Sequence, residues 1–269
     1  MRSITKLNRI PNVEAGNSCS LKLPLGQTYE NVHLTYSGVT AAQIKNVRIE
    51  LNGRLLTEYK TLQELLDHNK RMKRHMAAGT ATFHFVEPEL KGVKTTDLIQ
   101  QRMFSLGTAG LSSAEIKFDI DAAAADPVIE AKAEKSIGTA PGWLTHRRST
   151  MVNLNNGITE IADLPKPVGY RIAAIHIKAA GVESVEYYID GTRWRDALSK
   201  VDNNYVLRQN NREPLDNTYT LDFMLQGDVY QSVALTQDIQ DMRLKIESTV
   251  QGQAQIIVEY MGIWSPQGF

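Results

Sequence analysis

The chain has 269 residues, 42% of them hydrophobic, which is enough for two domains of ordinary size, each with its own core. Lysine plus arginine and aspartate plus glutamate both number 30, so the formal net charge is zero. This balance argues against a protein that coats DNA or RNA, which would need a basic excess, and we expect no specific nucleic-acid partner. The single cysteine, Cys19, excludes an intrachain disulfide, so we expect packing to hold the fold in a reducing compartment.

Residues 1–15 form a mildly basic N-terminal arm that carries Arg2, Lys6 and Arg9. A loose terminus and an arm docked on the domain are both compatible with this composition. The arm lacks the apolar central run of a signal peptide, and no later apolar run approaches the length of a transmembrane helix. We therefore expect synthesis in the cytoplasm without secretion by a signal peptide.

Residues 16–125 have the pattern of a first domain made of strands and turns. A period-2 apolar run over 47–51 leads into the turn dipeptide Asn52-Gly53, which is a strong signal for a β-hairpin. Alternating apolar residues predict further strands over 19–26, 80–86 and 114–121.

A helix is predicted over residues 62–77, between two of these strands. Thr61 and Glu64 form a capping box, apolar residues follow at helical spacing, and Gly79 can end the helix. Its last residues, 70–75, form the densest basic run of the chain. Because basic side chains suit a helix C-terminus, a solvated helix end is favoured here over a nucleic-acid patch. A second, short helix is predicted over 98–104.

Residues 126–149 change in composition, with several alanines, prolines and glycines, and are predicted to be a linker with a helical part over 127–135. Residues 150–269 then form a second domain with a C-terminal tail. Its predicted elements are a helix over 196–207 and strands over 218–225, 242–250 and 255–261.

The second domain repeats the pattern of the first. Residues 34–53 match residues 172–191 at a fixed offset, the hairpin offset (191 − 53 = 138), and both segments end in a turn dipeptide, Asn52-Gly53 or Asp190-Gly191. The same offset places Thr80 on Thr218 and Phe85 on Phe223. Two further matches need other loop lengths: 19–26 with 150–157, and 114–119 with 242–247. A fixed long period predicts a duplicated domain, although two unrelated β domains share much of this pattern.

The predicted fold class is therefore all-β, with two tandem antiparallel barrels or sandwiches and short inserted helices. About 120 residues per half fits a jelly roll of eight strands in two sheets.

The sequence contains little that indicates catalysis. It lacks the nucleotide-binding, zinc-protease and serine-hydrolase motifs GxxxxGK[ST], GxGxxG, HExxH and GxSxG. His33, His84 and His176 lie in predicted strands, where a structural role is expected, and Cys19 is expected to be a buried, inert thiol. Tryptophans can line a sugar site, but more often fill cores and subunit contacts. They are Trp143, Trp194 and Trp264.

The duplicated stretches VRIELNG and VEYYIDG, the helix beginning near Thr61 and the flanking strands resemble the double jelly-roll major capsid proteins. Over its whole length the chain resembles the corticovirus members of that lineage, from marine bacteriophages with an internal membrane. The resemblance implies a structural virion protein without enzymatic activity. It also implies homotrimers that form pseudo-hexagonal tiles of an icosahedral shell around a membrane. The partners implied are other trimers, a vertex (penton) protein, and internal-membrane proteins or the lipid surface. The compact loops of this chain place tall surface towers in doubt.

An alternative is a tandem jelly-roll glycan-binding protein or hydrolase. Such a protein needs a cleft with converging acids and aromatic residues, and it is usually secreted. The expected absence of a signal peptide argues against it.

The marine-virus resemblance and a group of acidic residues together predict calcium, the one cofactor expected. Asp119 and Asp121 are two residues apart on a strand, so both point to its polar face, and Asp126 follows after a short alanine run. Calcium prefers several hard oxygen ligands, and clustered carboxylates repel one another without a cation. A solvated strand face followed by a linker is the simpler interpretation.

The N-terminal arm is predicted to lie at a subunit edge or on the membrane side.

Overall fold

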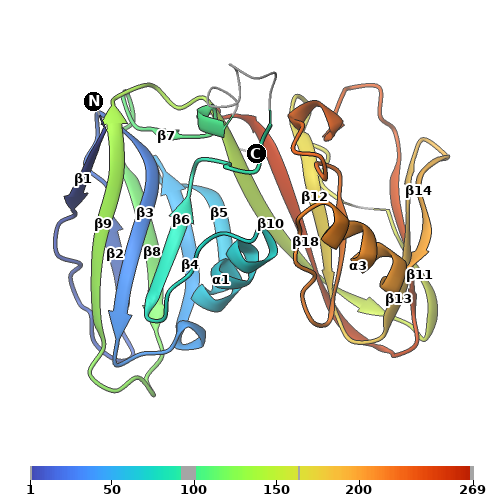
Figure 1. The fold of residues 1–269 in the computed structure, drawn as a ribbon, viewed down its shortest axis with the longest axis horizontal. Coiled ribbons are helices and arrows are strands. Elements are labelled where there is room, and N and C mark those ends of the chain that lie inside the picture. Colours follow the sequence, from blue (N-terminus) through green and yellow to red (C-terminus); the bar gives the residue numbers. More distant parts are fainter. Residues whose placement is uncertain (1, 92–100, 163, 267–269) are drawn as a thin grey trace. The chain divides into compact units, whose positions relative to one another are not determined.

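The computed structural model describes residues 2–91, 101–162 and 164–266, and the chain forms two compact units (Figure 1). The first unit comprises residues 1–147 and 263–269, and the second comprises residues 148–262. One boundary falls inside β10 (Trp143–Leu154) and the other at the end of β18 (Gly252–Ile263).

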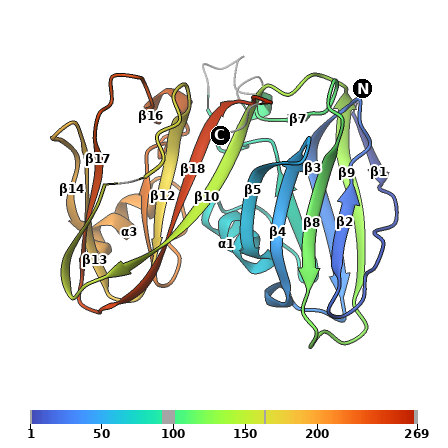
Figure 2. The same cartoon turned by 180° about the vertical axis from the view of Figure 1, so that it is seen from behind.

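In the part of the chain that is described, the first unit contains two sheets whose own strands pair antiparallel, and residues 143–147 of β10 add one parallel contact to β5 (Figure 2). One sheet has the order β1 (Ser3–Lys6), β9 (Val128–Ile137), β3 (Gln27–Ser37), β6 (Thr80–His84), and the short β7 (Leu106–Gly107) pairs with β3. The other has the order β2 (Ser18–Lys22), β8 (Ala114–Ile120), β4 (Ile44–Leu51), β5 (Arg54–Thr61).

The second unit has the same strand order. Its first sheet is β10, β18, β12 (Arg171–Lys178), β15 (Thr218–Asp222), and the short β16 (Val233–Ala234) pairs with β12. Its second sheet is β11 (Gly157–Ile161), β17 (Met242–Ser248), β13 (Val182–Ile189), β14 (Thr192–Ser199). Each unit is therefore a jelly roll, and the predicted fold class is confirmed.

The hairpin offset holds through the hairpin, the helix and the next strand. It relates β4 to β13, β5 to β14, α1 (Leu62–Arg71) to α3 (Lys200–Gln209), and β6 to β15. Both hairpin turns have positive φ at two successive residues, Asn52-Gly53 and Asp190-Gly191, as a two-residue turn between twisted strands requires.

Two of the predicted matches are wrong outside this stretch: the part of 34–53 that lies in β3, and the match of 19–26 with 150–157. Hydrogen-bond register places His33 opposite Thr82 and His176 opposite Thr220, so β3 and β12 are related by a larger offset (176 − 33 = 143). The counterpart of β2 is β11, not the segment 150–157, which belongs mostly to β10. The cause is the period of two in strands: an alternating run matches another equally well after any even shift, and only pairing decides the register.

The predicted linker is also corrected, because most of residues 126–149 is strand. Residues 128–137 form β9, which pairs with β1 and β3. Buried Ile129, Ala131 and Ala133 alternate with polar residues there, so the helix predicted from composition is wrong. The N-terminal arm is docked, since β1 pairs with β9 along Ser3–Lys6.

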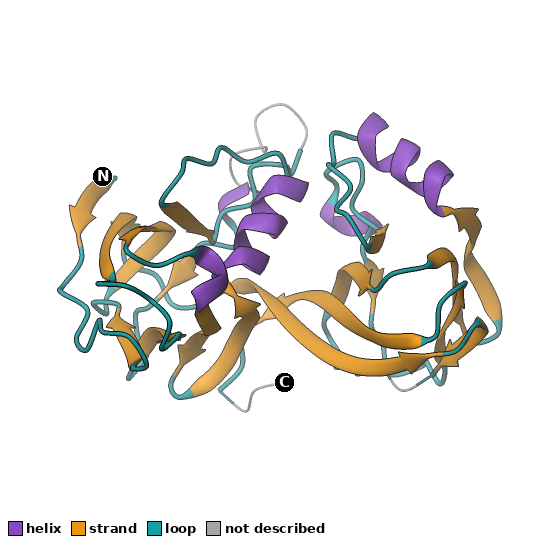
Figure 3. Ribbon diagram, turned by 90° about the horizontal axis from the view of Figure 1, so that it is seen from below, coloured by secondary structure: helices purple, strands orange, loops and turns teal. Residues whose placement is uncertain are grey.

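The two α-helices that face the sheets, coloured purple in Figure 3, differ from their predicted bounds. α1 ends at Arg71 rather than 77, because Lys73 takes a left-handed φ of 53°. Thr61 makes no side-chain capping bond, whereas Glu64 accepts from the Lys60 amide at 3.0 Å. α3 begins at Lys200, where the Ser199 hydroxyl accepts from the amide of the third helical residue. The helix predicted over 98–104 lies mostly outside the described residues.

Each helix packs in the same place in its unit. α1 contacts β4, β5 and β6, and α3 contacts their counterparts β13, β14 and β15. The apolar faces of the sheets enclose the cores, including Val32, Val47 and Ile116 in the first unit and Ile175, Val185 and Leu244 in the second. Among the residues that the structure describes, no helix has the length and apolarity needed to cross a bilayer.

Gly38 holds the β3–β4 loop against the turn that follows β8. Its φ is +69°, its carbonyl accepts from the Ala125 amide at 3.0 Å, and an added Cβ would overlap the carbonyl oxygens of Ala125 and Asp126. Gly26 also has a positive φ, +75°, but a Cβ there would meet open space.

We expect Gly38→Ala to destabilise the protein clearly more than Gly26→Ala. The Gly26 substitution carries only the left-handed backbone cost of about 1–2 kcal/mol, whereas the Gly38 substitution adds a steric overlap with backbone. Chemical denaturation of both variants and wild type measures the difference. Equal destabilisation would contradict the close packing of these two loops.

Candidate functional site

A threonine, a histidine and a glutamate bridge three neighbouring strands of the first unit. His33 on β3 lies between Thr82 on β6 and Glu134 on β9. Its Nδ1 is 2.9 Å from the Thr82 hydroxyl, and its Nε2 is 3.1 Å from Glu134 Oε1. Asn31 donates to the other Glu134 oxygen at 2.8 Å. Burial alone would raise the pKa of Glu134, but hydrogen bonds from Asn31 and His33 lower it below its usual value.

The second unit contains the same bridge. His176 Nδ1 on β12 is 2.9 Å from the Thr220 hydroxyl on β15, and its Nε2 is 3.2 Å from Glu259 Oε1 on β18. This copy is buried, whereas the first is half-buried. In each unit a helix asparagine also donates to the carbonyl of the bridging threonine, Asn69 at 2.8 Å and Asn203 at 3.0 Å. The structural role predicted for the strand histidines is confirmed for His33 and His176.

A buried arginine after the helix is the second repeated feature. Arg74 lies 2.6 Å from Glu87 and from Glu89, and Arg212 lies 3.1 Å from Asp222. The two arginines are related by the hairpin offset, and both side chains are buried. The solvated helix end predicted for residues 70–75 is wrong for Arg74, and for Arg71, which is also buried.

The ion pair of the first unit shifts the pKa of both partners. Burial alone would lower the pKa of Arg74, but Glu87 and Glu89 raise it above its ordinary value. Burial would raise the pKa of Glu89, but the charge and hydrogen bond of Arg74 lower it to about 2. Arg74 and Glu89 are therefore both charged at neutral pH and in mild acid.

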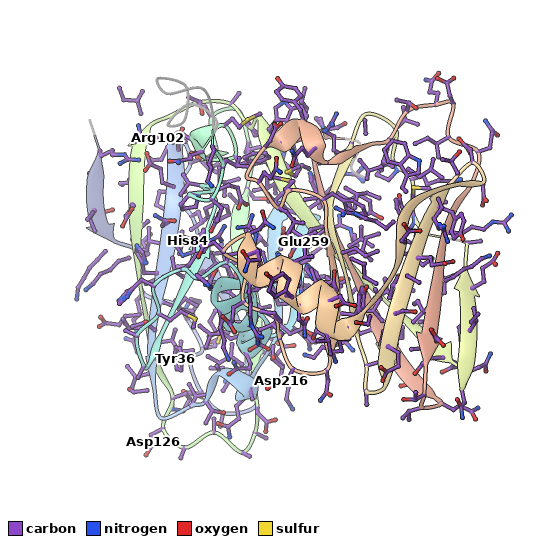
Figure 4. All side chains as sticks on the ribbon, turned by 45° about the vertical axis from the view of Figure 1, so that its right-hand side comes forward. Tyr36, His84, Arg102, Asp126, Asp216 and Glu259 are labelled. Atoms are coloured by element: carbon purple, nitrogen blue, oxygen red, sulfur yellow. The ribbon has the colours of Figure 1, made fainter. Side chains whose placement is uncertain are left out.

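His84 lies in the same region of the first unit, in β6 (Figure 4). Both of its ring nitrogens are buried, and neither has a hydrogen-bond partner among the described residues. Burial, together with the nearby positive charge of Arg74, lowers the pKa of His84 to about 3. The imidazole is therefore neutral at pH 7.

The structure does not bring the three predicted calcium ligands together. Asp119 accepts hydrogen bonds from the Ser18 hydroxyl at 2.6 Å and the Asn46 amide at 2.7 Å, which lower its pKa. Asp121 pairs with Lys45 and accepts from a backbone amide. Asp126 lies in the turn at one end of the unit (Figure 4).

In the described ranges, no group of three or more His, Cys, Asp or Glu side chains is placed to hold a metal. A calcium ion at Asp119 would have to displace the two hydrogen-bond donors, so these residues do not form a ready-made site. Calcium at this position stays a prediction.

Cys19 and two of the three tryptophans have structural environments. Cys19 is buried, its thiol is 3.3 Å from the Asn12 carbonyl oxygen, and burial raises its pKa to about 11. Trp143 packs edge-on against Phe104 with ring centroids 6.3 Å apart. Trp264 packs against the core of the first unit, whereas Trp194 is exposed.

Two family models match the chain in succession. The viral coat protein P2 N-terminal domain matches residues 4–136, and the viral coat protein P2 C-terminal domain matches residues 144–264. The chain belongs to the viral coat protein P2 family.

A full-length relative and its crystal structure agree with this assignment. The major capsid protein P2 of Pseudoalteromonas phage PM2 is 68% identical over 100% of both chains. The crystal structure of the P2 protein from bacteriophage PM2 superposes with a TM-score of 0.99 over 100% of both chains. The resemblance to corticovirus major capsid proteins is confirmed.

More distant structures share the fold alone. The STIV major capsid protein has a TM-score of 0.70 at 9% identity and covers 98% of this chain and 97% of its own. The PBCV-1 virus capsid protein has a TM-score of 0.60 at 9% identity, with coverage of 100% and 96%.

Sequence reasoning missed both repeated clusters in this P2 family member. The Thr–His–Glu bridges were hidden because His33 and His176 do not share the hairpin offset. Arg74 and Arg212 do share the hairpin offset. A comparison of the two halves that included polar residues would have matched these two arginines. Their acidic partners, however, lie at different offsets, so the ion pairs themselves required the fold.

We expect the unfolding free energy to fall as pH decreases from about 6.5 toward 3, with His84 contributing up to about 1.4 kcal/mol per pH unit. The sign follows from the lowered folded-state pKa: above pH 6.5 the residue is neutral in both states, and below it only the unfolded chain takes up the proton. His84→Asn should flatten this slope, measured by urea unfolding at several pH values. His75→Asn, at an exposed position, is the control and should keep the wild-type slope.

The calcium prediction is tested by thermal melts with calcium and with chelator. Binding to the folded state raises the melting temperature by ligand linkage. The predicted site requires that shift in wild type and its loss in Asp119→Asn/Asp121→Asn. No shift in wild type would end the calcium prediction, and an equal shift in the double variant would move the site elsewhere.

Proposed function

We propose that this chain is the major capsid protein of a membrane-containing bacteriophage and that it builds the capsid shell as a homotrimer. The observation that carries the proposal is the duplicated jelly roll within a family of viral coat proteins. The relative that is 68% identical is itself named a major capsid protein.

The duplication supports a trimer in particular. The two units share one strand order, so three chains supply six similar units around one axis. Six similar units give a pseudo-hexagonal outline although the true symmetry is three-fold, and such tiles fill a surface by closed contacts between copies. A single jelly roll per chain would need six chains for the same tile.

The other partners follow from the geometry of a shell. Hexagonal tiles alone form a flat sheet, so a closed icosahedral shell needs a different vertex (penton) protein at its five-fold positions. The inner side of the tiles would contact internal-membrane proteins or the lipid surface. The chain would be made in the host cytoplasm and reside in the outer capsid of the virion.

We also propose that the chain carries no catalytic activity. Three buried carboxylates that an acid–base mechanism could have used are each paired with an arginine. They are Glu30 with Arg2, Glu64 with Arg147, and Asp222 with Arg212. Nothing in the comparisons favours the alternative of a glycan-binding protein or hydrolase.

We expect purified protein to have the mass of a trimer, ~90 kDa from three chains of 30.1 kDa, at micromolar concentration. Light scattering coupled to gel filtration measures this mass. A stable monomer or dimer across that concentration range would contradict the trimeric tile.

A further inference from the structure

Corresponding edge strands of the two units have different surroundings. In the first unit, residues 143–147 of β10 lie along β5, with Arg147 paired with Thr57 in a parallel ladder. The Thr57 hydroxyl donates to the Thr145 carbonyl, and Arg147 donates to the Glu58 carbonyl, each at 2.9 Å. The Arg147 guanidinium also lies 4.5 Å from the centre of the Tyr59 ring. The outer edge of β5 is thus covered by the same chain.

In the second unit the counterpart of β5 is β14, whose outer edge is bare among the described residues because it pairs with β13 alone. It is the last strand of its sheet, and seven of its eight residues are exposed. Both strands carry a bulge at the same position, where one extra residue interrupts the register: Leu56 in β5 and, at the hairpin offset, Trp194 in β14. Leu56 is 2% exposed and Trp194 is 60% exposed. A bulge redirects its side chain out of the regular alternation, so an exposed tryptophan there is positioned for contact.

The outer faces of the two helices differ in the same sense. In α1 the outward positions hold Gln63 and Asp67, joined by a hydrogen bond of 2.9 Å. The same positions in α3, at the hairpin offset, hold Val201 and Tyr205, which are 78% and 64% exposed. Apolar side chains thus replace a polar pair on the helix that follows the bare strand. Val201 and Tyr205 are four residues apart and share one face of α3, and neighbouring exposed apolar side chains of this kind mark an interaction site.

The segment that would cover β14 is indicated by the strand order. The strand that covers β5 is β10. In the second unit β10 lies next to β18, and in the first unit β1 lies next to β9 at the corresponding position. β1 is therefore the counterpart of β10. β1 is also the end strand of its sheet, so its outer edge is open in the described part of the chain, and Ile4 on it is 72% exposed. β10 of this chain already lies beside β5, so the strand that covers β14 is expected to be its counterpart, β1. That β1 strand belongs either to another molecule or to the same chain.

We propose that Trp194, Val201 and Tyr205 form a subunit contact, whose occupant is the β1 strand of a second copy of this chain, with Ile4 against Trp194. The proposal rests on the homotrimer proposed above and names its contact surfaces. The two surfaces are different, so the contact is heterologous, and a heterologous contact generates a ring when its rotation closes. Three such contacts close a trimer and leave no β14 edge uncovered.

The first test replaces the apolar cluster by polar residues, two of them taken from α1. The triple variant Trp194→Ser/Val201→Gln/Tyr205→Asp changes exposed positions only, so its circular dichroism and monomer fold should be retained. We expect its trimer dissociation constant to rise at least about a hundredfold, because a central tryptophan and tyrosine commonly dominate a protein contact. The matched control, Gln63→Ala/Asp67→Ala in α1, should keep the wild-type trimer.

The second test is a disulfide between copies. The native cysteine is buried, so in Ile4→Cys/Trp194→Cys the two introduced thiols are the accessible pair. Under mild oxidation we expect covalent dimers and trimers on a non-reducing gel, and monomer only from either single variant. The control pair Ile4→Cys/Ile158→Cys places the second thiol at another exposed position and should not cross-link.

The outcomes separate the two proposals. If wild type is a monomer, the homotrimer is wrong. If wild type is a trimer but the triple variant stays trimeric and the thiol pair does not link copies, the trimer stands and the β1–β14 contact is wrong. A cross-link confined to single chains would also overturn it, because β1 would then cover β14 of its own molecule.

Discussion

An antiparallel sheet ends in strands whose outer N–H and C=O groups need partners, and this constraint organises both units. A jelly roll has such edges because its two sheets do not close into one barrel. In the first unit the chain covers β5 with residues 143–147, adding hydrogen bonds and a stacked arginine to the edge. In the second unit, among the residues that the structure describes, the corresponding strand β14 pairs with β13 alone.

The interiors of the two units depend on paired charges as well as on apolar packing. Removing one member of a buried pair leaves an uncompensated charge, which costs far more than the pair contributes. The Thr–His–Glu bridges join three strands at fixed positions, so they favour one register over shifted ones that the apolar pattern alone would tolerate. Their presence in both units, at the same place in the sheet, indicates that register control is part of what the duplication preserved.

The two units diverge where their surroundings differ. The hairpin, helix and following strand keep one length in both, while the loop before the hairpin is shorter in the second unit. On the helix surface, Gln63 and Asp67 give way to Val201 and Tyr205 without a change in helix length. A duplicated domain conserves what its own core requires and changes the surfaces that meet different neighbours.

Local patterns in the sequence were sufficient for the duplication, the hairpins at Asn52-Gly53 and Asp190-Gly191, and most of the strands, because period-2 alternation and turn chemistry act over a few residues. They were also sufficient for the structural role of His33 and His176. They failed for β9, whose alanines, glutamates and lysines favour a helix until β1 and β3 pair with it.

They failed again for Arg74, whose charge predicts solvent until the fold brings Glu87 and Glu89 to it. Strand register, ion pairing and the choice of which edge is covered all join residues far apart in the chain. Those contacts form only when the sheets assemble, and for that reason the tertiary structure alone decided them.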